Sequence, residues 1–101
     1  MAALKKIHYD KKRCAEAASI FKTLSHPQRL HIFCCLCEQE RTVSDLQNEC
    51  AIPQAVISQH LSRMRLEGLV LPKRSGSFVS YRVADPRLIT LIDTMQRITH
   101  E

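Results

Sequence analysis

The stretch that decides the fold is residues 53–65, PQAVISQHLSRMR. Ile57, Leu61 and Met64 recur in it at intervals of four and three residues, which places their side chains on one face of an α-helix. Glutamine can pair with adenine, alanine can contact a thymine methyl group, and arginine can pair with guanine or phosphate. The opposite arc carries short or hydrogen-bonding side chains and one long charged side chain, and we predict that this arc reads DNA. Its residues are Gln54, Ala55, Ser58, Gln59, Ser62 and Arg63.

A basic β-hairpin is expected directly after this helix. Gly68 stops the helix, and residues 69–74 and 78–83 are rich in the residue types of strands, with a short glycine-containing tip between them. Lys73 and Arg74 are expected to reach phosphates or the minor groove, and such charges mostly position a protein on DNA without specifying the sequence. Two neighbouring helices followed by such a hairpin predict a winged helix-turn-helix.

The rest of the chain predicts one helix after the hairpin and three before the DNA-reading helix. Asp10, Thr42 and Asp85 are suitable helix caps, and Pro27 and Pro86 suit the first turn of a helix. The element order is α-α-α-α-β-β-α, so we expect a mainly α single domain over residues 1–101 with a small β-hairpin. The four additional helices are predicted at about residues 11–24, 27–39, 43–50 and 86–99.

Composition favours a polyanionic partner. The chain has 101 residues, with 15 Lys and Arg against 10 Asp and Glu, giving a formal net charge of +5. No apolar run approaches the about 18 residues of a membrane span, and we expect no secretory leader. Five cysteines, an odd number, indicate free thiols in a reducing cytoplasm. No triad, carboxylate pair or phosphate-binding glycine loop can be placed, so an enzyme is not expected.

Three stretches resemble the ArsR/SmtB family of winged helix-turn-helix repressors. They are LSHPQRLHI at 24–32, ISQHLSRMRLEGLV at 57–70 and SYRV at 80–83. The resemblance covers about residues 15–98. It implies a homodimer built from the first and last helices, which binds double-stranded DNA at an imperfect inverted repeat. Such a dimer blocks transcription until an inducer changes its shape.

The usual metal sites of that family do not match this sequence. The family's cysteine-containing run on the third helix is replaced by Thr42–Leu46, which has no cysteine. The family's zinc site on the last helix needs an Asp, two His and a Glu, and only Asp85 and Glu101 fit. Arg87 and Ile98 stand where the histidines belong, and arginine is not a zinc ligand. We therefore expect no required cofactor and no metal at these positions.

The thiols are the remaining candidates for sensing. Cys34 stands at the position of the sensing cysteine in the BigR/YgaV/HlyU-like branch that the sequence resembles most, although the last-helix cysteine of that branch is absent. Cys34, Cys35 and Cys37 lie within one helical turn and are predicted to respond to a soft metal, a metalloid or reactive sulfur. Cys35 points away from the other two, so gathering them requires local unwinding or recruitment of Cys14 or Cys50.

Three other interpretations remain open at this point. Free cysteine is a common core residue, so Cys34 and Cys37 could serve only as core filling, with Cys14 and Cys50 as bystanders. The chain could also be a thiol redox or metal-buffering protein, although it lacks a Cys-x-x-Cys pair at a helix start. Finally, the fold could be a winged-helix interaction module that contacts protein and does not bind DNA.

Overall fold

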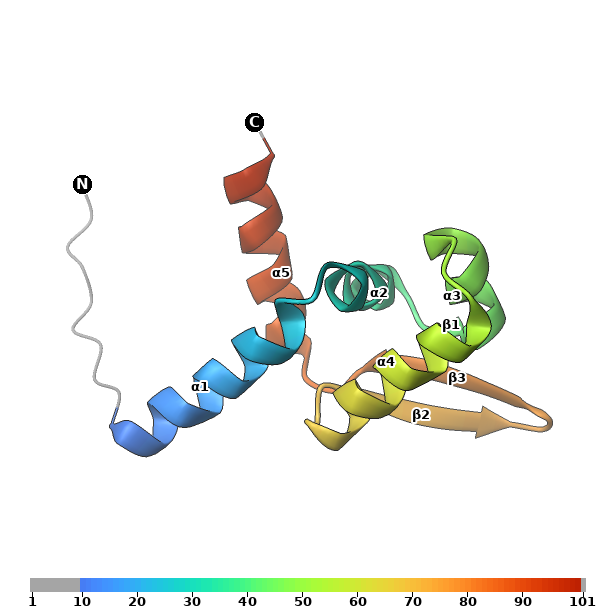
Figure 1. Ribbon diagram of the computed structural model, residues 1–101, viewed down its shortest axis with the longest axis horizontal. Helices are drawn as coiled ribbons and strands as arrows, with labels where there is room; N and C mark the ends of the chain where they lie inside the picture. Colours follow the sequence, from blue (N-terminus) through green and yellow to red (C-terminus); the bar gives the residue numbers. More distant parts are fainter. Residues whose placement is uncertain (1–9, 101) are drawn as a thin grey trace.

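Residues 10–100 are the part of the chain that the computed structural model describes (Figure 1). Every predicted helix and strand is present in it, with bounds within one residue of those expected, so the mainly helical winged helix-turn-helix architecture is confirmed. Residues 1–9 and Glu101, one of the two carboxylates that match the family's zinc site, lie outside the described part. The elements are α1 (Lys11–Leu24), α2 (Pro27–Glu38), β1 (Arg41–Thr42), α3 (Val43–Cys50), α4 (Gln54–Leu66), β2 (Val70–Ser75), β3 (Phe78–Val83) and α5 (Pro86–Thr99).

The helix starts are set by local hydrogen bonds. The Asp10 carboxylate accepts a bond of 2.8 Å from the backbone N–H of Arg13 and so caps α1. At α3, the Asp45 N–H donates to Thr42 Oγ1 over 3.1 Å, and the Thr42 N–H donates to Asp45 Oδ2 over 2.9 Å. This reciprocal pair satisfies two N–H groups that a helix end otherwise leaves unpaired. The same contacts hold the pKa of Asp45 below its ordinary value.

The short strand β1 was not predicted. The sheet has the order β1-β3-β2, and β1 pairs antiparallel with β3 through Arg41 opposite Tyr81 and Thr42 opposite Ser80. Two residues are too few to show the alternation by which a strand is recognised in a sequence. The pairing nevertheless matters, because it attaches the base of the hairpin to the start of α3.

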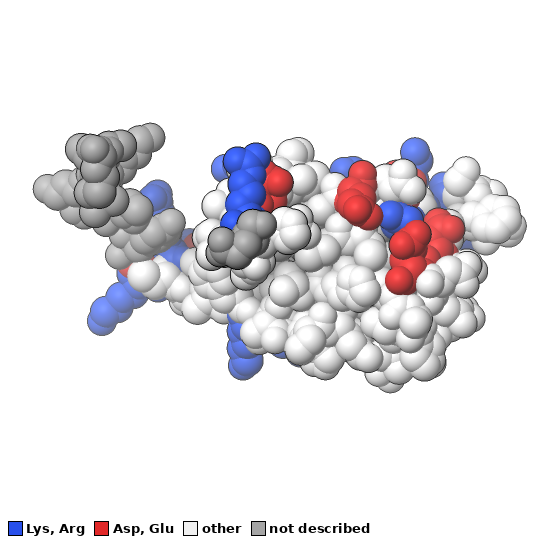
Figure 2. Space-filling view, turned by 90° about the horizontal axis from the view of Figure 1, so that it is seen from above, with Lys and Arg blue, Asp and Glu red and all other residues white. Residues whose placement is uncertain are grey.

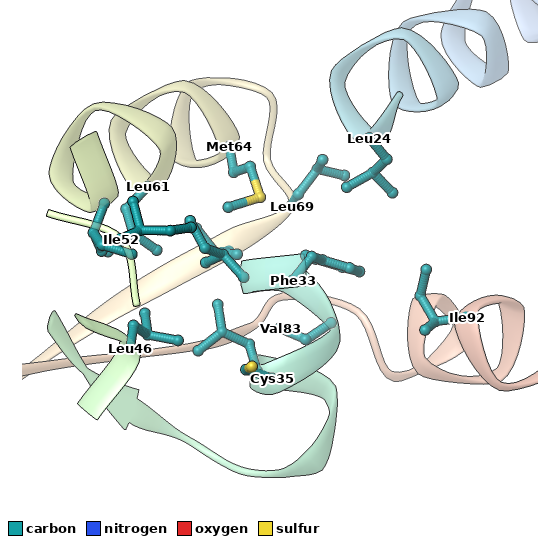
Figure 3. Close-up of a cluster of buried hydrophobic side chains, with 14 residues drawn as sticks. Leu24, Phe33, Cys35, Leu46, Ile52, Leu61, Met64, Leu69, Val83 and Ile92 are labelled. Atoms are coloured by element: carbon teal, nitrogen blue, oxygen red, sulfur yellow. The ribbon is translucent and has the colours of Figure 1, made fainter. Parts of the chain in front are cut away.

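The core is built around α2 (Figure 3). Ile32 and Phe33 are fully buried, and Leu36 is nearly so. The predicted core face of α4 is confirmed, since its apolar residues at intervals of four and three are buried with at most 1% exposure: Ile57, Leu61 and Met64. Burial of each of these apolar side chains stabilises the folded state by about 1.5–3 kcal/mol. It therefore fixes the rotation of α4 about its axis.

Two outer helices keep apolar side chains in solvent. Helix α1 buries only Thr23 and Leu24, at its C-terminal end, and leaves Phe21 55% exposed. In Figure 1, α1 and α5 project from the same end of the molecule, away from the hairpin tip.

None of the helices within residues 10–100 combines the length and the hydropathy that crossing a bilayer requires.

Candidate nucleic-acid interface

The predicted DNA-reading arc of α4 lies in solvent. The residues between its members face the core. All six side chains of the arc are exposed: Gln54, Ala55, Ser58, Gln59, Ser62 and Arg63. Their order along α4 places the small and amide-bearing groups in the first two turns and the guanidinium near the end. This face can enter a groove without moving any core residue.

The turn before α4 depends on one residue in a left-handed conformation. Ala51, which follows the last residue of α3, has φ 54° and ψ 42°, and its N–H donates to the Gln47 carbonyl over 3.0 Å. Ile52 then turns back into the core with 5% exposure, and α4 begins after Pro53. The buried Ile52 and the tight turn set the angle between α3 and α4.

The hairpin carries its two predicted cations on opposite faces. Lys73 pairs with Ser80 and Arg74 pairs with Val79 in the ladder between β2 and β3, and both cations are exposed. Successive residues of a strand point to opposite sides, so the two charges flank the ribbon instead of forming one patch. Gly76, with φ 64°, allows the two-residue turn at the tip.

Other exposed charges near this surface were not predicted. Arg65 on α4 and Arg82 on β3 are both exposed. Arg63, which was predicted, has its Nε 3.5 Å from Glu67 Oε1, and Glu67 also accepts a 3.0 Å bond from the Ser19 hydroxyl of α1. An exposed ion pair of this kind contributes about 0–1 kcal/mol, so Arg63 can exchange Glu67 for a phosphate.

Elsewhere the surface charge is mixed. Figure 2 shows a face on which acidic side chains stand beside basic ones, with wide uncharged areas between these groups. At the end of α2, Arg41 lies 2.9 Å from Glu38 and 3.2 Å from Glu49. Opposite charges so close largely cancel at a distance. Cations with no ion pair within residues 10–100, such as Lys73 and Arg74, therefore dominate attraction for a polyanion.

His60 lies on the core side of α4 and is held by hydrogen bonds. The residue is 8% exposed, with Nε2 3.2 Å from the Gln28 amide oxygen and Nδ1 3.4 Å from Arg29 Nε. Burial is the main cause that lowers the pKa of His60, followed by the nearby His26 and the Arg29 charge. A buried, hydrogen-bonded imidazole of this kind orients a helix and is not available to bases.

The three cysteines predicted to sense line one open groove of about 490 Å³ between α2 and α5. Cys35 is buried, whereas Cys34 and Cys37 are half-buried. Burial, and then the neighbouring Cys35, raises the pKa of Cys34, and burial together with Cys34 raises the pKa of Cys37 to about 12. These two thiols are therefore protonated at neutral pH.

A fourth cysteine joins this group from another helix. Cys50 Sγ lies 3.7 Å from Cys35 Sγ, and burial together with this contact raises the pKa of Cys50 to about 12. The sequence named Cys50 only as a thiol that could be recruited, beside Cys14, because 15 residues separate Cys50 from Cys35 and it falls in a different helix. Figure 3 shows Cys35 at the edge of the labelled cluster of buried side chains.

The last-helix zinc position is occupied by an ion pair. Arg87 Nη2 lies 2.7 Å from Asp85 Oδ2, and the hydrogen bonds from Arg87 hold the pKa of Asp85 below its ordinary value. The carboxylate also accepts the backbone N–H of Arg87 and so caps α5. Asp85 thus caps α5 and pairs with Arg87.

Comparison with known proteins identifies the family. Residues 26–71, which span α2, α3 and α4, match the family model described as bacterial regulatory protein, arsR family. A biofilm growth-associated repressor from Xylella fastidiosa is 36% identical over 87 residues, which cover 86% of this chain and 76% of that protein. Among solved structures, HlyU from Vibrio cholerae superposes with a TM-score of 0.85 at 27% identity, over 91% of this chain and all of that one.

A further structural neighbour is a homodimer. The homodimeric winged helix-turn-helix domain of Mb0332 from Mycobacterium bovis has a TM-score of 0.74 at 25% identity, and the match covers 92% of this chain and 94% of that one. The exposed arc of α4, the basic hairpin and these matches lead to one conclusion. The chain belongs to the arsR family of bacterial regulatory proteins and is a DNA-binding transcriptional regulator.

Proposed function

We propose that the chain is a cytoplasmic, homodimeric repressor that inserts α4 of each protomer into successive major grooves of an imperfect inverted repeat. The observation that carries this proposal is the exposed arc around Ser58 and Gln59, held outward by the buried Ile57 and Leu61. No side chain among the described residues caps the N-terminus of α4. Its first N–H groups and the positive end of its dipole therefore suit a DNA phosphate.

The apolar side chains of α1 and α5 support the homodimer. Phe21 on α1 is 55% exposed, and Ile98 on α5 is 74% exposed. Covering such side chains with a second copy of the chain removes apolar surface from water. Because α1 and α5 project from the end of the molecule opposite the hairpin tip, a partner there leaves α4 and the hairpin free (Figure 1).

We also infer that chemistry at the α2 thiols releases the DNA. Cys34, Cys35 and Cys37 line a groove whose other wall is α5, the helix assigned to the dimer. Thiol modification, or binding of a soft metal or metalloid, would alter the packing of α2 against α5. That change would alter the distance between the two copies of α4, which must match the repeat of B-form DNA.

Gel shift on the chain's own promoter tests the DNA-binding proposal. We expect a Kd of about 10⁻⁸ M or tighter for the operator, as is typical of specific complexes. The double variant Ser58→Ala, Gln59→Ala should lose about 1–3 kcal/mol of discrimination per lost base contact while keeping the fold. Gln39→Ala, at an exposed position after α2, is the matched control and should bind as the wild type does.

Equal and weak binding to every sequence would instead indicate a winged-helix module that contacts protein.

The sensing proposal is tested separately, by DNA release with arsenite, cadmium, zinc, persulfide or peroxide on the wild type and Cys34→Ser. If none of these agents releases the wild type, the sensing proposal is wrong and the DNA-binding proposal stands.

A further inference from the structure

Two helices bring three metal-binding side chains together beneath the turn that leads to α4. His31 and Cys35 stand four residues apart on α2 and therefore share one side of that helix. Cys50, the last residue of α3, lies against them. A ring nitrogen of His31 and the two sulfurs all lie within 4.8 Å of one another.

The separation of the sulfurs is that of two ligands on one ion. In a tetrahedral site with Zn–S bonds of about 2.3 Å, two sulfurs stand about 3.8 Å apart. Cys35 Sγ and Cys50 Sγ are 3.7 Å apart. A disulfide would need the sulfurs at about 2.05 Å, so it requires the helices to approach, whereas an ion fits the resting positions.

The geometry points to a binding site for a thiophilic divalent ion, such as Zn²⁺ or Cd²⁺, formed by His31, Cys35 and Cys50 and bridging α2 to the end of α3. On binding, each thiol releases its proton to solvent, and the two thiolates neutralise the charge of the ion. The neutral imidazole of His31 supplies the third bond and water the fourth. Soft sulfur ligands with one imidazole select this class of ion over Mg²⁺ or Ca²⁺.

The surroundings leave the site open to an entering ion. His31 is exposed and, with Cys35, lines the open groove of about 490 Å³ between α2 and α5. Arg41 is the nearby cation, with its Nε 3.4 Å from the Cys35 carbonyl oxygen. Its charge is offset by Glu38 and Glu49, with which it forms ion pairs. The ligands differ from the third-helix and last-helix positions considered above, and the site needs no DNA.

Cadmium titration of the reduced protein under anaerobic conditions tests the site. The readout is the ultraviolet charge-transfer absorption of Cd–thiolate bonds, with affinity measured by competition with a chelator. We expect one ion per chain with the intensity of two thiolates. Loss of a group that only orients a ligand costs about 10- to 100-fold in affinity, so Cys50→Ser and His31→Gln should each cost at least that much.

A cysteine outside the groove provides a matched control. Cys14→Ser changes an exposed thiol of α1 that is neither a ligand of this site nor part of the groove between α2 and α5, and it should keep the absorption and the affinity. Circular dichroism establishes that each variant is folded. Since a ligand that binds only the folded state raises its stability, Cd²⁺ should also raise the Tm of the wild type and of Cys14→Ser, but not that of folded Cys50→Ser.

The outcomes separate the proposed site from its neighbours. Unchanged absorption in Cys50→Ser would place the ion on the thiols of α2 and overturn the proposal, and loss of absorption in Cys14→Ser would overturn it too. The absence of any thiolate absorption in the wild type would overturn it as well. DNA binding plays no part in these measurements, so their failure would leave the proposed repressor function untouched.

Discussion

The Arg29 guanidinium of α2 donates a hydrogen bond from Nε to Nδ1 of His60 on α4, over 3.4 Å. Arginine has no acceptor, so Nδ1 must be unprotonated and the ring proton sits on Nε2, which donates to the Gln28 amide oxygen. Arg29 also donates from Nη1 to the Thr23 carbonyl of α1 over 2.9 Å. One neutral imidazole therefore connects the orientation of α4 to the junction of α1 and α2.

Stability should fall as the pH drops below the unfolded pKa of histidine, about 6.5. Because the pKa of His60 is lowered in the folded chain, the unfolded state binds the proton first. The contribution of His60 is thus complete above about pH 6.5 and is lost progressively as the pH falls toward its folded pKa. Urea unfolding at fixed protein concentration, from about pH 7.5 to about pH 5, measures this slope.

Substitution of His60 should remove this pH dependence. His60→Gln keeps a hydrogen-bonding side chain that does not titrate, so the slope should flatten. His31→Gln changes an exposed histidine and should retain the slope. A wild-type free energy of unfolding that does not change over this range would show that His60 is not linked to folding.

The hairpin cations should contribute affinity without sequence preference. Lys73→Ala and Arg74→Ala should each weaken binding to operator and random DNA alike and reduce the salt slope of log K by about 1. Because the two side chains leave β2 on opposite faces, their effects should add. Lys22→Ala, an exposed cation on α1, should leave the slope unchanged. Gel shifts at several salt concentrations decide the matter.

The turn between α3 and α4 should be stabilised by glycine. Ala51 adopts a left-handed conformation that costs an L-residue with a Cβ about 1–2 kcal/mol, and glycine avoids this cost at about 0.5–1 kcal/mol of extra chain entropy. Ala51→Gly should therefore raise the free energy of unfolding by about 0.5–1 kcal/mol. Ala51→Val, which is β-branched, should lower it. Chemical denaturation of both variants tests the sign.

The proposed dimer should depend on Phe21 and not on the other strongly exposed phenylalanine. Phe21→Glu puts a charge into the apolar face of α1 and should yield monomers in sedimentation velocity runs. Phe78→Glu makes the same change at the hairpin, where the side chain is 70% exposed, and should leave the dimer intact. Dissociation by Phe78→Glu, or a dimeric Phe21→Glu, would place the interface elsewhere.

The local features of the chain could be predicted because their causes lie within a few residues. The Thr42–Asp45 capping box, the spacing of Ile57, Leu61 and Met64, and the glycine at the hairpin tip act over distances of one to seven positions. The predicted arc of α4 is exposed for the same reason, since a helix with one buried face must turn the opposite face to solvent.

The sequence by itself thus determined the helices, the hairpin and the outward face of α4. Only the tertiary structure decided that Cys50 meets Cys35 and His31 and that β1 pairs with β3. These are contacts between elements far apart along the chain. Periodicity states which face of a helix is buried, but the residue that it meets depends on how the helices cross. That crossing is set by the packing of the whole core, which no short stretch of sequence contains.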